Sequence, residues 1–237
     1  MVIPGDNPAN ALAPATGFVS TARDLARFFA QLDPAANESV LAIASRREMI
    51  RHQWRNPHFS FERYYGLGIY SGKLADWEWF GHNGAFPGFV SRTAVLPDPG
   101  LAVSVVTNAA DGLADRWLEG AIHILASFAK HGAPTGEVRD WTGRWWTRWV
   151  AIDLVAMGGK VMVGSPALPN PFADASQISV SSPDCGHISL ATGFAHYGEP
   201  VRRIRGADGN VEEVWLGSAR FQPEAAVAAE LDQHYRG

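Results

Sequence analysis

Residues 89–107 read FVSRTAVLPDPGLAVSVVT, and this stretch decides the fold. Two apolar runs, Phe89–Leu96 and Leu101–Thr107, flank the turn sequence Pro97-Asp98-Pro99-Gly100. The prolines restrict the backbone angle φ, and the glycine can adopt values of φ that other residues rarely do. The stretch therefore predicts a β-hairpin. With two strands predicted upstream, at Tyr65–Tyr70 and Trp77–Phe80, the hairpin completes an antiparallel meander.

Helices are predicted before and after this meander. Thr21 and Asp24 have the spacing of a capping box, and the apolar residues that follow repeat at helical intervals. Residues 39–51 are predicted as a second helix, and residues 113–130 as a third that Gly132 ends. A helix laid on one face of an antiparallel sheet is an α+β arrangement.

The pattern changes after Ala133–Glu137, a segment that contains Pro134 and Gly136 and is the best candidate boundary. Residues 138–237 are almost wholly β in pattern, with hairpin signals at Gly158-Gly159 and Asp208-Gly209. Short strands are predicted around these turns, and an alanine-rich helical tail follows Phe221. We therefore expect two domains, residues 1–133 and a small antiparallel barrel or sandwich at residues 138–237.

Composition excludes several classes of function. The 237 residues carry a formal net charge of −4, which argues against nucleic-acid binding. No apolar run is long enough for a membrane-spanning helix, and the N-terminal residues lack the pattern of a signal peptide, so the sequence leaves the compartment open. The histidines and the single cysteine, Cys185, show no metal-ligand spacing, and no nucleotide-binding loop is present. We predict no metal and no cofactor.

The segment GHNGAFPG, residues 81–88, is the place where chemistry is concentrated. A histidine at the end of a strand, here His82, can transfer a proton near neutral pH. Gly84 would let a substrate lie against the backbone, and the N–H of Ala85 could face a developing oxyanion. Taken alone, His-x-Gly is a weak motif that also describes an ordinary histidine in a tight turn.

The order of four elements adds a specific resemblance. The segment from Thr16 to Phe28, Tyr65-Gly66-Leu67-Gly68, the histidine segment, and the hairpin ending in Val105-Val106-Thr107-Asn108 resemble serine β-lactamase-related proteins. This family includes class C β-lactamases, D-aminopeptidases, carboxylesterases and D-alanyl-D-alanine carboxypeptidases. The resemblance implies a partial β-lactamase-like transpeptidase fold over residues 1–133.

The resemblance also implies roles for individual residues. His82 and Gly84 match the family's third motif, which sits on a strand that edges the active site, and Ala85 falls where the family supplies an oxyanion-hole N–H. Asn83 and Phe86, from the same segment, are the candidate substrate-binding residues. The implied parent hydrolyses a small-molecule amide or ester through an acyl-serine.

The family's nucleophile motif, Ser-x-x-Lys, and its Tyr-x-Asn motif lie upstream of the matched region and are missing here. Ser127-Phe128-Ala129-Lys130 is the only Ser-x-x-Lys in the sequence, and it follows the third motif instead. We interpret it as an ordinary helical pair and keep Ser127 chemistry as a minor alternative. The chain is therefore expected to be a C-terminal fragment that is inactive alone, and to need an N-terminal complementing segment or to self-associate.

Residues 138–237 resemble the lipocalin-like barrel that is appended to many of these hydrolases. The cues are Asp140–Trp146, the Gly-Gly-Lys hairpin, Tyr197–Val201 and Asp208–Glu212. The alternative function is a non-catalytic module in which this tryptophan-rich barrel binds a ligand or a partner. Its candidate pocket residues, which could equally fill the barrel, are Trp141, Trp145, Trp146 and Trp149.

Overall fold

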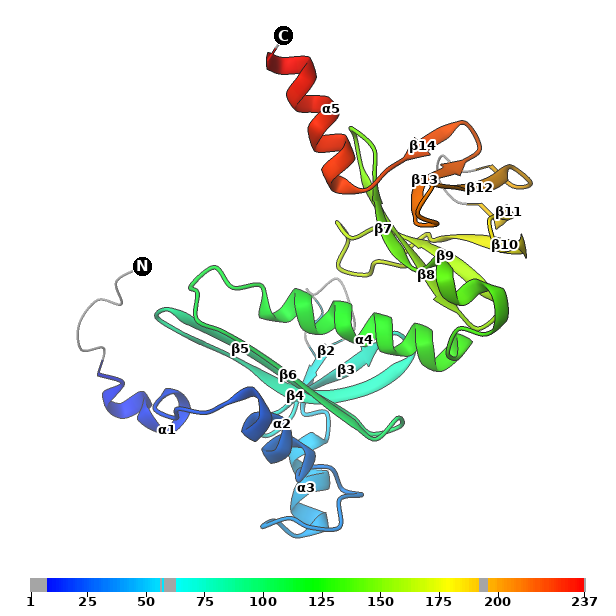
Figure 1. The fold of residues 1–237 in the computed structure, drawn as a ribbon. Coiled ribbons are helices and arrows are strands. Elements are labelled where there is room, and N and C mark those ends of the chain that lie inside the picture. The colour runs from blue at the N-terminus through cyan, green and yellow to red at the C-terminus, as the bar shows by residue number, and fades with distance from the viewer. Residues whose placement is uncertain (1–7, 56, 58–62, 192–195, 237) are drawn as a thin grey trace. The chain divides into compact units, whose positions relative to one another are not determined.

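The computed structural model describes residues 8–55, 57, 63–191 and 196–236. Contacts within the chain divide it into two units, Met1–Ile122 and His123–Gly237, and each is described by itself. The predicted boundary at residues 134–137 lies later in the chain, because helix α4, Ala114–His131, contributes its second half to the second unit (Figure 1).

The first unit begins with short helices. These are η1 Asn10–Leu12, α1 Ala13–Thr16, α2 Ala22–Ala30 and α3 Ile43–Ile50. The predicted cap is confirmed, because the Thr21 hydroxyl accepts the Asp24 N–H at 3.1 Å and donates to the Asp24 carboxylate at 2.9 Å.

The sheet of the first unit is antiparallel and follows chain order. Its six strands are β1 Trp54–Arg55, β2 Arg63–Tyr65, β3 Tyr70–Leu74, β4 Trp77–Phe86, β5 Phe89–Leu96 and β6 Leu101–Thr107. The prediction of one strand at residues 65–70 was wrong, because the chain reverses there. Gly68 has a φ of +73°, and a Cβ on Gly66 would lie 2.1 Å from the Met49 carbonyl oxygen.

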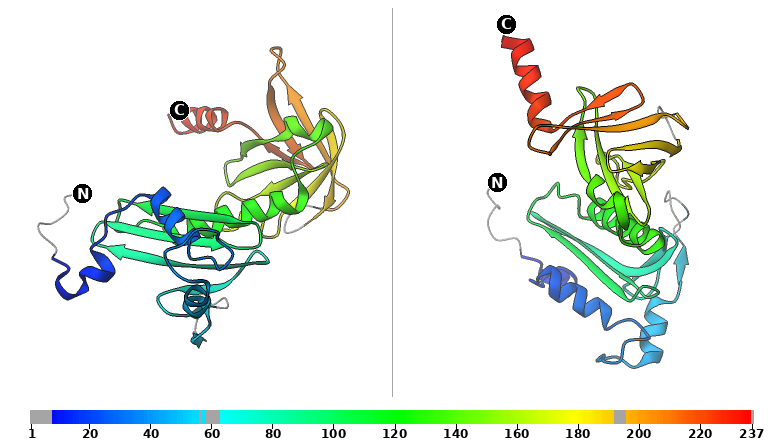
Figure 2. Two further views of the ribbon diagram at one scale, coloured as in Figure 1. Left: turned by 90° about the horizontal axis from the view of Figure 1, so that it is seen from below. Right: turned by 45° about the vertical axis from the view of Figure 1, so that its right-hand side comes forward.

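Alternating side chains give this sheet two apolar faces. Trp79 and Leu96 pack with Leu118 and Ile122 of α4 on one face. Phe80 follows Trp79 and Val95 precedes Leu96, so both point to the other face. There they pack with the α2 region. Figure 2 shows the sheet between the two helices. This sandwich fixes β4 and β5 at the centre of the unit.

The second unit is an eight-stranded antiparallel sheet in sequential order. Its strands are β7 Gly143–Trp146, β8 Ala151–Met157, β9 Lys160–Gly164, β10 Ser176–Ser182, β11 Cys185–Leu190, β12 Pro200–Arg205, β13 Val211–Leu216 and β14 Ala219–Phe221. The 3₁₀ helix η2, Gly136–Trp141, precedes the sheet, and α5, Glu224–Arg236, follows it. Trp146 and Gln222 exchange two backbone hydrogen bonds of 2.8 Å, which bring the two ends of the sheet together into a barrel-like form.

The tryptophans of this unit have different environments. Trp141 is only 1% exposed and belongs to the barrel core, against which the Trp145 ring also packs. Trp146 forms the backbone bridge that joins the sheet ends, whereas Trp149 is 91% exposed. These positions favour the interpretation in which the tryptophans at 141 and 145 fill the barrel.

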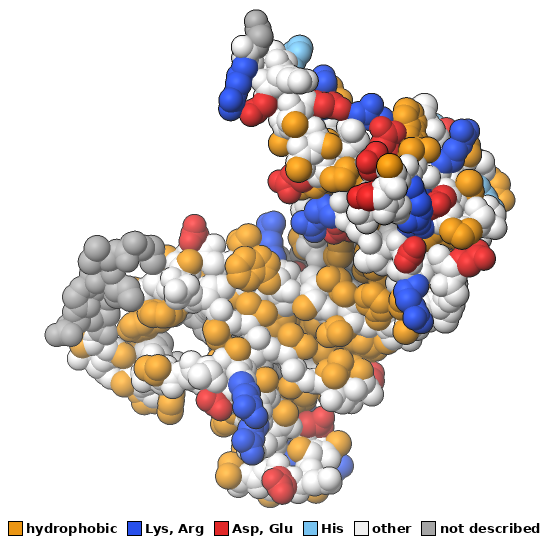
Figure 3. Space-filling model, viewed as in Figure 1, with side chains coloured by type: hydrophobic (Ala, Val, Ile, Leu, Met, Phe, Trp, Pro, Cys, Tyr) orange, Lys and Arg blue, Asp and Glu red, His pale blue; other side chains and the backbone are white. Residues whose placement is uncertain are grey.

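Large apolar side chains are exposed on the first unit. Val19 is fully exposed, and the Phe18, Phe28 and Phe89 rings are also open to solvent. Figure 3 shows exposed hydrophobic side chains over the sheet and the N-terminal helices of this unit. Exposed apolar side chains that gather on one face mark a candidate interaction face.

Candidate functional site

Strand β4 extends beyond the end of its neighbour β3. Tyr70 pairs with Gly81 as the last β3–β4 pair, whereas pairing with β5 continues to Phe86 and Phe89. Among the described residues, the segment 82–86 therefore has a strand neighbour on one side only. The other side of this segment has no strand partner, although the Asn83 carbonyl there accepts from the His82 ring.

All five predicted site residues, His82, Asn83, Gly84, Ala85 and Phe86, lie in this segment of β4. The prediction that the histidine ends a strand next to a turn was wrong, because the strand continues to Phe86. Every residue from 80 to 86 has a partner in β5, and only Pro87-Gly88 forms the turn, with Gly88 at a φ of +86°.

His82 is held at both ring nitrogens. Its Nδ1 lies 2.5 Å from the carbonyl oxygen of Asn83, and its Nε2 lies 3.2 Å from the Tyr65 hydroxyl. A carbonyl oxygen only accepts, so Nδ1 carries the proton, and in the neutral ring Nε2 accepts from Tyr65. The half-buried His82 ring also lies 4.8 Å from the Tyr70 ring, centroid to centroid. The imidazole is therefore oriented before any substrate arrives.

The other predicted residues differ in exposure. Asn83 is half-buried, whereas Gly84, Ala85 and Phe86 are exposed. A Cβ on Gly84 would lie 2.6 Å from the Ser91 hydroxyl oxygen, so a larger residue there would displace Ser91. The constraint is stronger at Gly81, where a Cβ would lie 2.0 Å from the Thr93 carbonyl oxygen. The strand can pack closely on β5 because both positions lack side chains.

The sequence did not single out the aromatic and basic residues beside His82. The Tyr65 and Tyr70 rings lie 4.5 Å apart, and the Arg63 guanidinium carbon lies 3.6 Å from the Tyr70 ring centroid. The register of β2, β3 and β4 brings these residues together. Their only signal in the sequence is the clustering of three aromatic or basic residues at positions 63–65.

A buried cation lies on the α4 face of β5. The Arg92 guanidinium lies 4.4 Å above the Trp79 ring, and its Nε lies 3.3 Å from the Asp115 carboxylate. Burial lowers the pKa of Arg92, and the carboxylate of Asp115 counteracts this effect. Burial also raises the pKa of nearby Glu119, and repulsion from Asp115 adds to this rise.

We expect Glu119→Gln to raise the melting temperature at neutral pH. Because the pKa of Glu119 is higher in the folded protein, the folded chain binds more protons above the ordinary value of 4.5. Stability from the protonated form is present below that value and is lost as the pH rises through the folded pKa. Glutamine, which stays neutral, removes this loss.

Thermal unfolding of the Glu119→Gln variant at several pH values tests this expectation. The gain in melting temperature should shrink toward zero below pH 4.5, the ordinary value of the group. Glu38→Gln, at an exposed position, is the matched control and should show no such pattern. A gain at Glu119 that is equal at acidic and neutral pH would contradict the assignment.

The part of the chain that the structure describes contains neither a metal-binding cluster nor a helix that could span a membrane. No group of three or more His, Cys, Asp or Glu side chains there could hold a metal ion. None of its helices combines the length and the apolar character that crossing a bilayer requires. What the described residues do provide at β4 is an oriented imidazole beside an open strand edge.

The fold and this edge define an α+β sheet-and-helix domain in which strand β4 extends beyond β3. The family model described as Beta-lactamase matches residues 2–125, which is more than half of the chain. The chain belongs to the beta-lactamase family, and this membership supports a serine hydrolase-type fold for the first unit.

Solved structures add more distant similarities. The octameric penicillin-binding protein homologue from Pyrococcus abyssi is 14% identical, with a TM-score of 0.41, and the match covers 86% of this chain and 47% of that one. SurE with D-Leu is 16% identical, with a TM-score of 0.36, and the match covers 86% of this chain and 49% of that one. SurE without D-Leu in its description is 16% identical, with a TM-score of 0.35, and the match covers 86% of this chain and 48% of that one. The chain thus spans about half the length of these proteins; a comparison with curated proteins gave no significant match.

Proposed function

We propose that this chain supplies the substrate-binding edge of a serine hydrolase that cleaves a small amide or ester. The observation that carries the proposal is segment 82–86 of β4, which pairs with β5 but lies beyond the end of β3, with His82 oriented at its start. An extended acyl group could pair with this edge as an added strand, and main-chain hydrogen bonds would then align its carbonyl.

The roles follow from the chemistry of each group. His82 would exchange a proton or a hydrogen bond with the leaving group through Nε2, the nitrogen that Tyr65 contacts. The N–H of Ala85 is the candidate donor to the oxyanion, and the bare backbone at Gly84 lets the substrate approach. Asn83 and Phe86 are the candidate contacts to the rest of the substrate.

An acyl-serine mechanism also needs a nucleophile with a neighbouring base. The only Ser-x-x-Lys pair in the sequence is Ser127–Lys130, on α4 within the second unit. We propose that the reacting serine belongs to a separate segment, and that this segment packs on the exposed apolar face of the first unit. Self-association over the same face is the alternative. The finer identities, a class C or D-aminopeptidase type with a lipocalin-like barrel, are part of the same proposal.

The test uses nitrocefin, p-nitrophenyl acetate and a fluorescent penicillin. The chain alone is expected to give neither turnover nor covalent label, whereas the chain joined to a Ser-x-x-Lys segment from its own reading frame should give both. Ser127→Ala in the joined protein should leave the activity unchanged. Covalent labelling of the 237-residue chain by itself would contradict the proposal, and label on Ser127 would establish the minor alternative.

A further inference from the structure

The hydroxyl of Ser91, on strand β5, stands beside Gly84 of the candidate site. The two residues are directly paired, and a Cβ built on Gly84 would lie 2.6 Å from Ser91 Oγ. Apart from Ser91 and the chain neighbours of Gly84, no described residue has a heavy atom within 4 Å of that point. The surface above the exposed Gly84 is therefore open, with one hydroxyl at its margin.

This hydroxyl is available for a ligand. Ser91 has no hydrogen-bond partner for its side chain among the described residues, and the side chain is half-buried. The hydroxyl of Thr93, two positions further along β5, differs because it is bonded to the Ser104 hydroxyl at 2.8 Å. A half-buried hydroxyl without a protein partner must bond to water or to a bound molecule.

The side chains around Ser91 on this face of the sheet are apolar. Paired residues share a face, and so do residues two apart on one strand, so Phe86, Phe89 and Val106 lie on the face of Ser91. All three are exposed and none is charged. The Arg92 guanidinium lies on the opposite face, against Asp115 of α4. A group that bonds to the Ser91 hydroxyl is therefore expected to be neutral.

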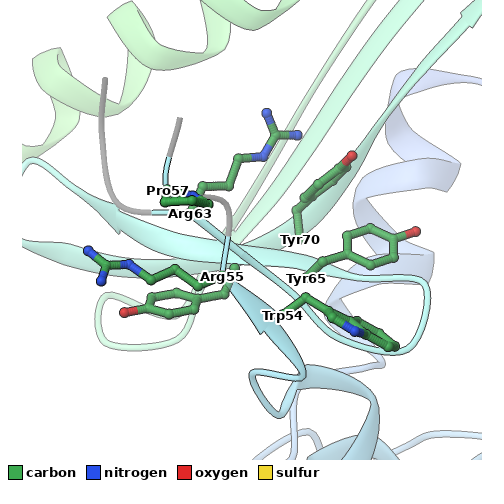
Figure 4. A pocket seen from close by; sticks show the side chains of 7 residues that line it. Trp54, Arg55, Pro57, Arg63, Tyr65 and Tyr70 are labelled. Atoms are coloured by element: carbon green, nitrogen blue, oxygen red, sulfur yellow. The ribbon is translucent and has the colours of Figure 1, made fainter. Parts of the chain in front are cut away.

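The Tyr65 and Tyr70 rings limit where a ligand can lie along β4. Figure 4 shows the two rings side by side, and their centroids are 4.5 Å apart. The Tyr65 hydroxyl lies 3.2 Å from His82 Nε2, and the Tyr70 ring lies 4.8 Å from the His82 ring, centroid to centroid. A ligand paired with β4 would therefore lie beyond these rings, along residues 83–86.

The spacing of paired strands sets the distance from such a ligand to Ser91. Neighbouring strands are about 4.8 Å apart, so a ligand beside β4 would lie about 10 Å from β5. The serine side chain and its hydrogen bond span roughly half of this distance. A substituent with a polar atom about three bonds from the ligand main chain spans the rest. Because Gly84 has no side chain, the substituent can pass over it.

We propose that Ser91 determines substrate specificity by hydrogen bonding, across Gly84, to a neutral polar group on the acyl part of the substrate. This inference rests on the proposed function for the position of the substrate along β4. It names a substrate class, namely esters or amides whose acyl part carries an uncharged hydrogen-bonding group about three bonds from the main chain. A side chain at position 84 would fill the space that this group has to cross.

Two p-nitrophenyl esters of equal length test the proposal in the joined, nucleophile-containing enzyme. The 3-methoxypropanoate ester carries an ether oxygen where the pentanoate ester carries a methylene. Ser91→Ala should raise KM for the methoxypropanoate ester about 5-fold with kcat unchanged, and should leave both constants for the pentanoate ester within about 2-fold. Ser104→Ala removes the hydroxyl that bonds to Thr93 and is the matched control, which should not separate the esters. Equal changes for both esters in Ser91→Ala would overturn the proposal.

Binding to the 237-residue chain separates this proposal from the hydrolase proposal, because it involves no turnover. N-acetylasparagine amide and N-acetylleucine amide have side chains of the same shape, but only the first is polar. In NMR titrations that follow the amide signals of residues 84 and 91, Ser91→Ala should weaken binding of the asparagine compound about 5-fold and leave the leucine compound unchanged. No binding of the asparagine compound, or equal losses for both, would contradict the role of Ser91. A loss confined to the asparagine compound, in a chain whose joined form shows no turnover, would contradict the hydrolase proposal alone.

Discussion

Replacing His82 by alanine is expected to lower kcat/KM by about 100-fold in the joined, nucleophile-containing enzyme. The imidazole is oriented by two hydrogen bonds, one from its own Nδ1 to the Asn83 carbonyl and one from Tyr65 to Nε2. A proton-transfer group that is already aligned loses little entropy in the reaction, so its removal should reduce kcat more than it raises KM. Steady-state kinetics with p-nitrophenyl acetate measure the effect.

Two further variants separate chemistry from folding. Tyr65→Phe keeps the ring but removes the hydroxyl donor, so we expect a smaller loss of about 5-fold and a changed pH profile, because the imidazole is then less constrained. His234→Ala, at an exposed position on α5, should retain full activity. If His82→Ala retains activity within about 2-fold while the enzyme stays folded, the histidine has no role in proton transfer.

Replacing Arg203 by methionine is expected to destabilise the barrel by about 3 kcal/mol. The Arg203 side chain is 2% exposed and lies 4.5 Å over the ring of buried Trp141. It donates at 2.6 Å to the Asp140 carbonyl, also donates to the Pro183 carbonyl, and lies 3.1 Å from the Asp184 carboxylate. Methionine fills part of the volume but leaves these acceptors without their donor.

Hydrogen exchange at the amides of β8 to β13 is the appropriate measurement, because a chain with two units need not unfold in one step. The partly exposed Asp184 keeps Arg205 as a second partner, at 2.9 Å, so the loss should stay below that of a fully buried unpaired charge. Arg202→Met, at the exposed neighbouring position on β12, is the control and should change exchange little. If Arg203→Met and Arg202→Met change hydrogen exchange equally, the buried contacts of Arg203 do not stabilise the barrel.

The best predicted elements are those with strong local signals. The hairpin of β5 and β6 matches its predicted bounds, because Pro97-Asp98-Pro99-Gly100 defines a turn between two apolar runs. Strand β9 likewise begins directly after the hairpin signal Gly158-Gly159. Strand β3 was misplaced because Tyr65–Tyr70 looks apolar along its length, and only the packing of Gly66 against Met49 shows that a turn is required. Strand β7 was missed because its four residues pair with β8 across residues 147–150, which contain neither Gly nor Pro as a turn signal.

The site was predicted only in part, for a similar reason. The composition of GHNGAFPG predicts a candidate site in this segment, but the strand conformation of these residues depends on pairing with β5. The Tyr65–His82 contact depends on the register of three strands, which no local pattern encodes. The position of Ser91 beside Gly84 depends on the register of β4 and β5, and therefore it could be found only from the folded chain.

The joining of Trp146 to Gln222 has a consequence for how the second unit folds. Every other pairing in its sheet connects strands that are adjacent in the sequence, so these hairpins can form from local collisions. The ends of the sheet can meet only across nearly the whole length of the unit, and that closure entropy must be offset by hairpins already in place. Ring closure should accordingly be a late event, and the same two amides should separate early when the unit opens.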